Sequence, residues 1–485
     1  MFFNSLNFAI FLPIVFILYW FFTKGNLRLQ NIILLLSSYF FYACWDWRFM
    51  FLLIFSTLLD YISGIKIHEA TNNKVKSYWL WLSIGINLGF LGVFKYFNFF
   101  SSSFSDGLSL IGFKSNFATL QVILPVGISF YTFHGLSYVI DIYKNRIKPE
   151  RNFIDYSVFV SFFPLLVAGP IERATHLLPQ IIKKREFDYA KAVEGLRQIL
   201  WGLFKKVVIA DNCAEYVNTI FNHSIITPGS THLLGAIFFS FQIYCDFSGY
   251  SDIAIGTAKL FGIDLIKNFA FPYFSRDIAE FWRRWHISLS SWFKDYLYIP
   301  LGGSKVNIKI KIRNTFIIFI ASGFWHGANW TFIVWGFLNA LYIMPLIIFK
   351  KNRHNLEIVA KGRILPTIKE FLSICVTYGL TVFAWIFFRS DNLGNAFSFI
   401  SVIFSRSLFS LPQGETFIGN VNPKTMCIII ILFIIIEWKG REQDFAIANF
   451  GKKWYRPIRW TWYCVILFYV FYFTGKQQQF IYFQF

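Results

Sequence analysis

The sequence predicts an all-α polytopic membrane protein, and three observations lead to this fold class. Hydrophobic residues make up 56% of the 485-residue chain and charged residues only 15%, against roughly 25% in an ordinary soluble domain. Apolar runs recur from end to end, and several approach the roughly 20 residues that a helix needs to cross a bilayer. The net charge of +20 is concentrated between these runs. We therefore expect residues 1–485 to form a single membrane-embedded domain.

The apolar runs, in chain order, give the predicted spans. They include Leu6–Phe22, Leu29–Trp45, Trp79–Phe94, Ile428–Ile436 and Trp460–Phe473. The first run has no basic segment before it and no small-residue cleavage site after it, so we interpret it as a retained span rather than a signal peptide. The sequence thus predicts a multi-pass protein of the cell membrane.

Basic residues orient the predicted spans. Ser101–Asn116 and Asn218–His232 are nearly free of lysine and arginine, whereas most other connecting segments are basic. The basic segments are Lys24/Arg28, Lys66–Lys76, Lys144–Arg151, Lys183–Lys191, Lys305–Arg313, Lys350–Lys369 and Lys439–Arg459. The positive-inside rule places them in the cytoplasm and the N-terminus outside. Because these charges flank apolar spans and form no groove interleaved with aromatic residues, we exclude a nucleic-acid partner.

Three segments depart from simple crossings. Phe153–Pro170 and Asn314–Phe349 are apolar, have basic segments on both sides and contain glycine or proline, which predicts re-entrant segments or paired half-helices. Non-helical backbone at membrane depth is tolerated only where protein or a water-filled cavity surrounds it, so both segments are expected to line an interior cavity. Asp277–Tyr298 mixes aromatic with charged residues, as in a helix lying at the membrane surface.

His326 is the strongest candidate for a functional residue. It is the only strongly ionisable side chain in Asn314–Phe349 and lies about 18 Å along a helix that starts at Asn314. That distance is near the middle of a hydrocarbon core roughly 30 Å thick, where an ionisable group is costly and predicts function. Gly323 and Gly327 flank it and allow another backbone or a substrate to approach closely.

The other histidines are weaker candidates. We predict solvated side chains for the histidines in polar segments, which are His68, His176, His223, His232 and His354. His134 lies in an apolar span and is expected to be a buried, hydrogen-bonded residue rather than a catalytic one. His286 follows Arg283 and Arg284, and the residues alone leave open whether it is functional or belongs to an interfacial helix.

No pattern predicts a metal site or a permanently bound cofactor. The six cysteines are far apart, with no Cys-x-x-Cys spacing, and the common nucleotide-binding and zinc motifs are absent from the sequence. A proton-coupled transporter or export channel is an alternative from another class. We rank it low because the spans contain few acidic residues, with Asp60 and Asp141 placed near predicted span ends.

Sequence stretches over almost the whole chain resemble the membrane-bound O-acyltransferases, in particular their bacterial branch that serves alginate and other envelope polysaccharides. The most specific are NFAFPYFSRDIAEFWRRWHISLSSWFKDYLYIPLGGSK (residues 268–305) and SGFWHGANWTFIVWGFLNALY (residues 322–342). The resemblance implies a helical bundle around a central tunnel, with a core region at about residues 270–350. His326 matches the family's catalytic histidine and His286 its second polar position, whereas His134 stands where we expect glutamine in many relatives.

The family chemistry suits these residues. A sugar hydroxyl attacks a thioester, and a buried, neutral histidine is able to accept the hydroxyl proton and return it to the leaving thiolate. The donor is expected to be acetyl-CoA or an acyl-carrier thioester. Arg283 and Arg284 are candidates for its phosphates, with lipid headgroups as the alternative. Tunnel candidates are Trp285, Trp325, Gly327 and Asn329. Direct transfer is favoured over an acyl-serine at Ser322.

The acceptor stays open at this stage. The resemblance implies an extracytoplasmic polysaccharide, either an alginate-like exopolysaccharide or peptidoglycan, reached directly or through a periplasmic SGNH-type acetyltransferase. D-alanyl transfer to teichoic acid is the alternative within the family. In a Gram-negative cell the protein would lie in the inner membrane.

Overall fold

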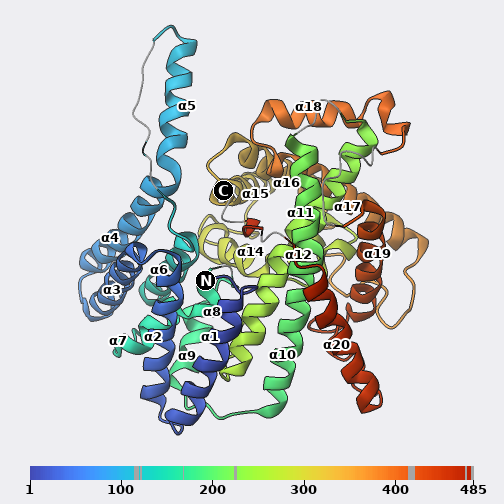
Figure 1. Ribbon diagram of the computed structural model, residues 1–485. Coiled ribbons are helices and arrows are strands. Elements are labelled where there is room, and N and C mark those ends of the chain that lie inside the picture. The colour runs from blue at the N-terminus through green and yellow to red at the C-terminus, as the bar shows by residue number, and fades with distance from the viewer. Residues whose placement is uncertain are drawn as a thin grey trace. The chain divides into compact units, whose positions relative to one another are not determined.

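The computed structural model describes residues 1–113, 120, 123–167, 169–222, 227–412, 421–475 and 478–481. The regular elements in these ranges are helices, with no strand among them. The chain packs as two compact units: unit 1 comprises residues 1–192 and 257–266, and unit 2 comprises residues 193–256 and 267–485 (Figure 1). The all-helical architecture confirms the predicted fold class.

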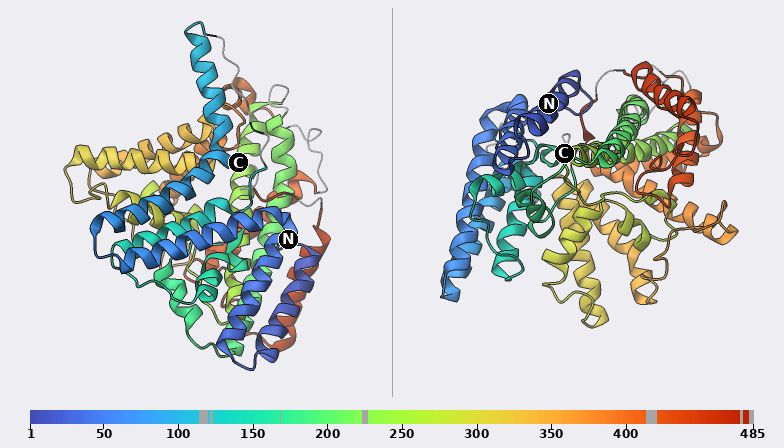
Figure 2. Two further views of the ribbon diagram at one scale, coloured as in Figure 1. Left: turned by 90° about the vertical axis from the view of Figure 1, so that its left-hand side faces the viewer. Right: turned by 90° about the horizontal axis from the view of Figure 1, so that it is seen from below.

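Unit 1 contains a group of closely packed helices. Its helices are α1 (Leu6–Ile17), α2 (Leu27–Asp46), α3 (Arg48–Glu69), α4 (Asn73–Leu91), α5 (Phe97–Leu110), α6 (Ile128–Tyr143), α7 (Phe153–Ser161), α8 (Phe163–Leu166) and α9 (Ala174–Ile182). Helices α3, α4 and α6 pack against one another (Figure 2). Phe153–Pro170 forms the short helices α7 and α8, which agrees with the predicted broken segment.

Two titratable side chains lie buried inside unit 1. His134 accepts a hydrogen bond from the Glu172 N–H at 3.1 Å and has no exposed surface, so the prediction of a buried, hydrogen-bonded histidine is confirmed. Asp60 lies in the middle of α3, where Ser83 Oγ and Asn87 Nδ2 donate to its Oδ1 at 2.6 and 2.9 Å. Its placement near a span end was therefore wrong, because α3 continues through Lys66 to Glu69.

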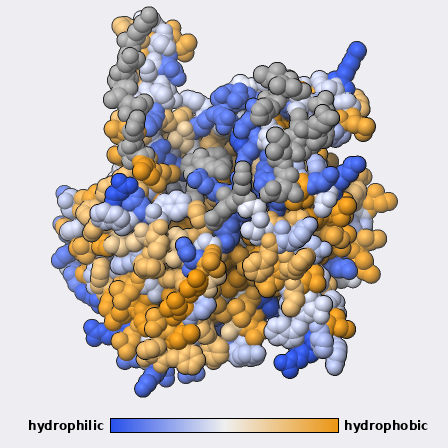
Figure 3. Space-filling model, viewed as in Figure 1, coloured by the Kyte–Doolittle hydropathy of each residue, from blue (hydrophilic) through white to orange (hydrophobic). Residues whose placement is uncertain are grey.

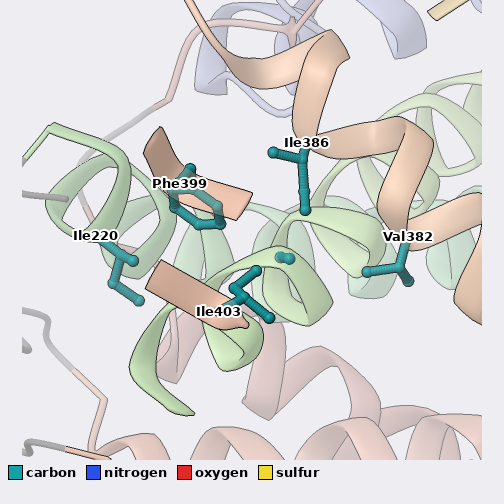
Figure 4. Close-up of a cluster of buried hydrophobic side chains, with 6 residues drawn as sticks. Ile220, Val382, Ile386, Phe399 and Ile403 are labelled. Atoms are coloured by element: carbon teal, nitrogen blue, oxygen red, sulfur yellow. The ribbon is translucent and has the colours of Figure 1, made fainter. Parts of the chain in front are cut away.

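Unit 2 holds the long C-terminal part of the chain. Its helices, wholly or mostly in this unit, are α10 (Tyr189–Leu203), α11 (Asp211–Asn222), α12 (Gly229–Leu260), α13 (Ile278–Arg284), α14 (Ile287–Phe293), α15 (Ile308–His326), α16 (Trp330–Ile348), α17 (Ile368–Arg389), α18 (Leu393–Ile403), α19 (Pro423–Gly440) and α20 (Arg456–Tyr472). A buried cluster joins α11, α12, α17 and α18 (Figure 4). Its members are Ile220, Ala236, Val382, Ile386, Phe399 and Ile403.

The histidines that were predicted to be solvated divide into two groups. His68 and His354 are exposed, and His176 is exposed with its Nδ1 2.9 Å from Glu172 Oε2. The prediction for His232 was wrong: its ring is fully buried in the first turn of α12 and lies 4.5 Å from the Phe399 ring, centroid to centroid. His223 lies outside the described residues.

The segment Asn314–Phe349 lies within a hairpin of two complete helices. Helices α15 and α16 contain 19 residues each and run side by side (Figure 2). At about 1.5 Å per residue each helix is about 28 Å long. The prediction of two paired helices is therefore confirmed, but these are full-length helices rather than half-helices. The helix start was misjudged because the basic residues Lys309, Lys311 and Arg313 belong to α15 rather than to a loop.

The helices supply several membrane spans. Within the described residues, five helical stretches are long and apolar enough to cross a membrane: α2, α3, the continuous stretch Asn73–Leu110, α16 and α17. The shorter apolar helix over Leu6–Phe22 corresponds to the first predicted span. Hydrophobic side chains cover much of the surface in Figure 3. The chain is therefore a multi-pass membrane protein.

Candidate active site

His286 and His326 lie side by side in unit 2, although 40 positions separate them in the sequence. Their ring centroids are 6.4 Å apart. The Trp325 ring lies 5.0 Å from that of His326 and 6.1 Å from that of His286. Both histidines are buried, with 0% and 3% of their surfaces exposed for His286 and His326. We call these two residues the histidine pair.

The α15–α16 hairpin places His326. This residue ends α15, and the extended Gly327 follows it as the C-cap. Asn329 caps α16, because its Oδ1 accepts from the Thr331 N–H at 3.0 Å and its Nδ2 donates to the Asp391 carbonyl at 2.7 Å. The His326 ring packs edge-on against Trp335 at 5.2 Å. His326 therefore lies at the break between two helices, not in the middle of one.

Glycines set how closely the two hairpin helices approach. A Cβ added at Gly323 would clash with the backbone oxygen of Phe332 on α16, and one at Gly327 would clash with the Phe332 ring. A Cβ at Gly336 would clash in the same way with the Phe319 carbonyl on α15. The predicted close approach at Gly323 and Gly327 is thus made by α16 itself.

A second break in the chain places His286. The predicted surface helix Asp277–Tyr298 is instead split into α13 and α14 at Trp285 and His286. His286 has φ of 43°, a left-handed conformation that is uncommon for non-glycine residues. Trp285 is also buried, at 1% exposed. The prediction of one continuous helix was wrong at this point, because the chain breaks where Trp285 and His286 pack into the interior.

Asn268 anchors the break, and sequence reasoning missed it. Its Oδ1 lies 3.1 Å from His286 Nδ1 and accepts from Ser288 Oγ at 2.9 Å. Its Nδ2 donates to Ser251 Oγ at 3.1 Å, and its backbone oxygen accepts from the Ile287 N–H at 2.9 Å. Asn268 is fully buried. Its only sequence signal is a polar residue opening the apolar run NFAF of the residue 268–305 motif.

This network assigns the tautomer of His286. Asn268 Oδ1 is an acceptor, as its contacts with Ser288 show, so His286 Nδ1 carries the hydrogen and Nε2 presents a lone pair. Burial lowers the pKa of His286 to about 3, which keeps the imidazole neutral near neutral pH. The ring of Phe247 packs edge-on against His286 at 4.6 Å.

An aromatic cluster lies behind the histidine pair. The Trp285 ring lies 5.0 Å from that of Trp385, which stacks on Trp335 at 5.6 Å. The rings of Tyr244 and Tyr273 each lie 6.0 Å from that of Trp285. These contacts restrict the conformation of the Trp285 side chain, which directly precedes His286.

Arg283 and Arg284 have different surroundings. Arg284 is largely buried, and its guanidinium donates to Glu280 Oε1 at 2.9 Å and to the Ala270 carbonyl at 3.2 Å. Arg283 is exposed and donates to the carbonyls of Asn352 and Asn355 at 2.9 and 2.8 Å. Glu280 forms an ion pair with the buried Arg284. Of the two arginines, the exposed Arg283 is therefore the one placed to meet a ligand.

A cavity of about 310 Å³ is lined by both Arg283 and Ser322. We call it the basic cavity, because Arg283, Lys294, Lys311 and Arg353 are among its lining residues. Apolar side chains, including Trp282, Ile318 and Phe319, line the rest. Ser322 precedes His326 by four residues on α15, about one helical turn.

Comparison with known proteins agrees with this architecture. The sequence pattern of the family described as MBOAT, membrane-bound O-acyltransferase, matches residues 144–387. The chain is 35% identical to the peptidoglycan O-acetyltransferase of Helicobacter pylori, over 93% of its own length and 91% of that protein. It is 40% identical to the probable alginate O-acetylase AlgI of Pseudomonas syringae pv. tomato, over 81% of its own length and 73% of that protein.

A more distant similarity connects the chain to a related activity. It is 30% identical to the teichoic acid D-alanyltransferase of Streptococcus thermophilus, over 54% of its own length and 68% of that protein. The stronger and longer matches are those to the O-acetylating proteins. The chain belongs to the membrane-bound O-acyltransferase family and is an acyltransferase.

Proposed function

We propose that the protein is an O-acetyltransferase that moves an acetyl group from a cytoplasmic thioester toward a hydroxyl of an extracytoplasmic polysaccharide. The observation that carries this proposal is the histidine pair, with ring centroids 6.4 Å apart. The basic cavity supports it, because Ser322, one of its lining residues, precedes His326 by one helical turn. The names of the relatives favour an alginate-like exopolysaccharide or peptidoglycan as the acceptor.

The basic cavity suits a thioester donor with phosphates on a long arm. Four cationic side chains among its lining residues can bind phosphates, and arginine pairs well with phosphate oxygens. The apolar lining suits the arm, and Ser322 is a lining residue one helical turn from His326. Acetyl-CoA is the simplest such donor, and an acyl-carrier protein would present the same phosphorylated arm.

His326 acts as the general base in this mechanism. Its imidazole takes the proton of the acceptor hydroxyl while the oxygen attacks the thioester carbonyl, and the C–S bond then breaks. The imidazolium returns the proton to the leaving thiolate, so the products are an acetyl ester and a thiol with no net proton uptake. Trp325 and Trp335 exclude water around this ring.

His286 positions the reacting groups. Its ring centroid lies 6.4 Å from that of His326, and the contact between its Nδ1 and Asn268 Oδ1 fixes the orientation of its ring. Loss of His286 is therefore expected to weaken positioning and leave residual turnover. Asn329 and Gly327 shape the hairpin turn rather than take part in the chemistry.

The proposal also includes the orientation of the protein in the membrane and a partner enzyme. We infer that the basic segments Lys305–Arg313 and Lys350–Lys369 face the cytoplasm, which puts the donor there. A periplasmic SGNH-type acetyltransferase is the expected partner where the acetyl group is relayed. In Lys309→Cys protein in intact cells, an impermeant thiol reagent should not label position 309; labelling from outside would reverse the topology.

The experiment that tests the function uses the full protein in sealed vesicles of defined orientation. Radiolabelled acetyl-CoA on the side of the basic segments should transfer label to alginate or peptidoglycan fragments on the opposite side, or to the added partner transferase. His326→Ala should abolish transfer, and His354→Ala, in an exposed histidine of the same unit, should not. Use of a D-alanyl carrier thioester in place of acetyl-CoA would overturn the acetyl assignment.

A further inference from the structure

An apolar groove of about 1240 Å³ in unit 2 is lined by residues of α12, α17 and α19. These helices are labelled in Figure 1. The walls of the groove include Phe241 of α12, Ile374 of α17 and Ile430 of α19, and residues 362–366 border one end. Most of its lining is apolar, and α17 is one of the candidate membrane spans. A hollow of this size facing hydrocarbon requires an apolar occupant, because water there would lack hydrogen-bond partners.

The groove has one polar end. On α19 its lining residues extend from Cys427 to Lys439, about 18 Å at 1.5 Å per residue, which is slightly more than the roughly 15 Å half-thickness of a hydrocarbon core. Trp438 Nε1 donates to the Ile364 carbonyl at 2.7 Å, and tryptophan is typical of the membrane–water interface. The groove therefore extends through one leaflet, with its polar end at the interface.

The cation at that end which is placed to meet an anion is Lys439. Arg363 and Arg441 also line this end, but Arg363 pairs with Glu370 at 2.8 Å and Arg441 with Glu442 at 3.6 Å. A lining acid, Glu437, turns inward, where it is buried and accepts from Tyr244 Oη at 2.7 Å. Lys439 is exposed next to Trp438, so its ammonium group is accessible to an anionic group.

We propose that this groove binds one anionic glycerophospholipid, with its phosphate beside Lys439 and its acyl chains between α17 and α19. The groove floor includes Tyr244 and Tyr273, whose rings lie 6.0 Å from Trp285. The groove lining and the aromatic cluster therefore share these two tyrosines. This site does not depend on which acyl group or acceptor the enzyme uses.

Native cysteines provide the test. Cys375 and Cys427 line the groove, whereas Cys44 and Cys464 are exposed elsewhere. In detergent-purified full-length protein, titration with phosphatidylglycerol should slow N-ethylmaleimide labelling of Cys375 and Cys427 at least fivefold, saturating near one lipid per protein. Cys44 and Cys464 should be unaffected. Equal slowing of all four cysteines, no slowing, or equal slowing by phosphatidylcholine would overturn the proposal.

Matched variants sharpen the test. Lys439→Glu should weaken phosphatidylglycerol retention in native mass spectrometry at least fivefold, and Lys453→Glu, an equal charge change at an exposed residue outside the groove, should not. Cys375→Trp should fill the groove and displace the lipid, whereas Val376→Trp, on the exposed neighbouring position, should retain it. Identical retention by all four variants would contradict the site, and none of these results bears on acetyl transfer.

Discussion

Two buried histidines, one in each unit, show what separates a structural imidazole from a catalytic candidate. His134 lies within α6, and its Nε2 accepts the Glu172 N–H. His326 ends α15 at a hairpin turn, and its ring centroid lies 6.4 Å from that of His286. It is one helical turn from Ser322, which lines the basic cavity. Both histidines are apolar-flanked and buried. Burial alone therefore does not distinguish the candidate catalytic histidine. His326 differs from His134 in its position at a helix end, its neighbouring histidine ring and its nearby cavity.

The largest expected difference lies in the two alanine variants. His326→Ala should lower the acyl-transfer rate by about 10²–10⁴-fold, the usual contribution of a general base. His134→Ala should keep most of the rate but lose about 1–3 kcal/mol of stability, because the Glu172 N–H is left buried without its acceptor. Initial rates per folded molecule and thermal unfolding measure the two effects. If His326→Ala retains more than about a tenth of the rate, the comparison fails.

The sequence predicted the all-helical fold class and the two candidate histidines, but not the contacts that position those histidines. His326 was found through its isolation in an uncharged run, and His286 through the family motif. The break at Trp285–His286 and its anchor Asn268 depend on hydrogen bonds between segments, which no local pattern encodes. The same holds for Arg284, whose partner Glu280 belongs to its own helix but whose burial depends on tertiary packing.

The adjacent arginines should separate binding from stability. Arg284→Ala should destabilise the fold by up to about 3 kcal/mol, because Glu280 is left buried with Arg276 as its remaining ion-pair partner. Arg283→Ala should instead raise the KM for acetyl-CoA about tenfold with little change in kcat, as expected for loss of a phosphate contact. Steady-state kinetics and unfolding together distinguish them. An unchanged KM in Arg283→Ala would remove the basic cavity as the donor site.

The smallest expected effect is a pH dependence of stability. The folded pKa of His286 is about 3, below its ordinary value near 6.5. Between these values the unfolded chain binds a proton at His286 and the folded chain does not, so stability falls as pH falls through this window. The slope of unfolding free energy against pH reports how many protons the chain takes up on unfolding. His286→Gln should lower that number by up to about one. Equal slopes between pH 7 and pH 4 would argue against a neutral, buried His286.

The most direct test of the histidine pair is a double-mutant cycle on single-turnover acyl transfer. The rates of wild type, His286→Ala, His326→Ala and the double variant would be compared under saturating donor. If the two rings serve one chemical step, His286→Ala keeps residual turnover, His326→Ala loses the step, and the double variant is no slower than His326→Ala alone. Losses that multiply in the double variant would show that the two residues act independently and would contradict a shared site.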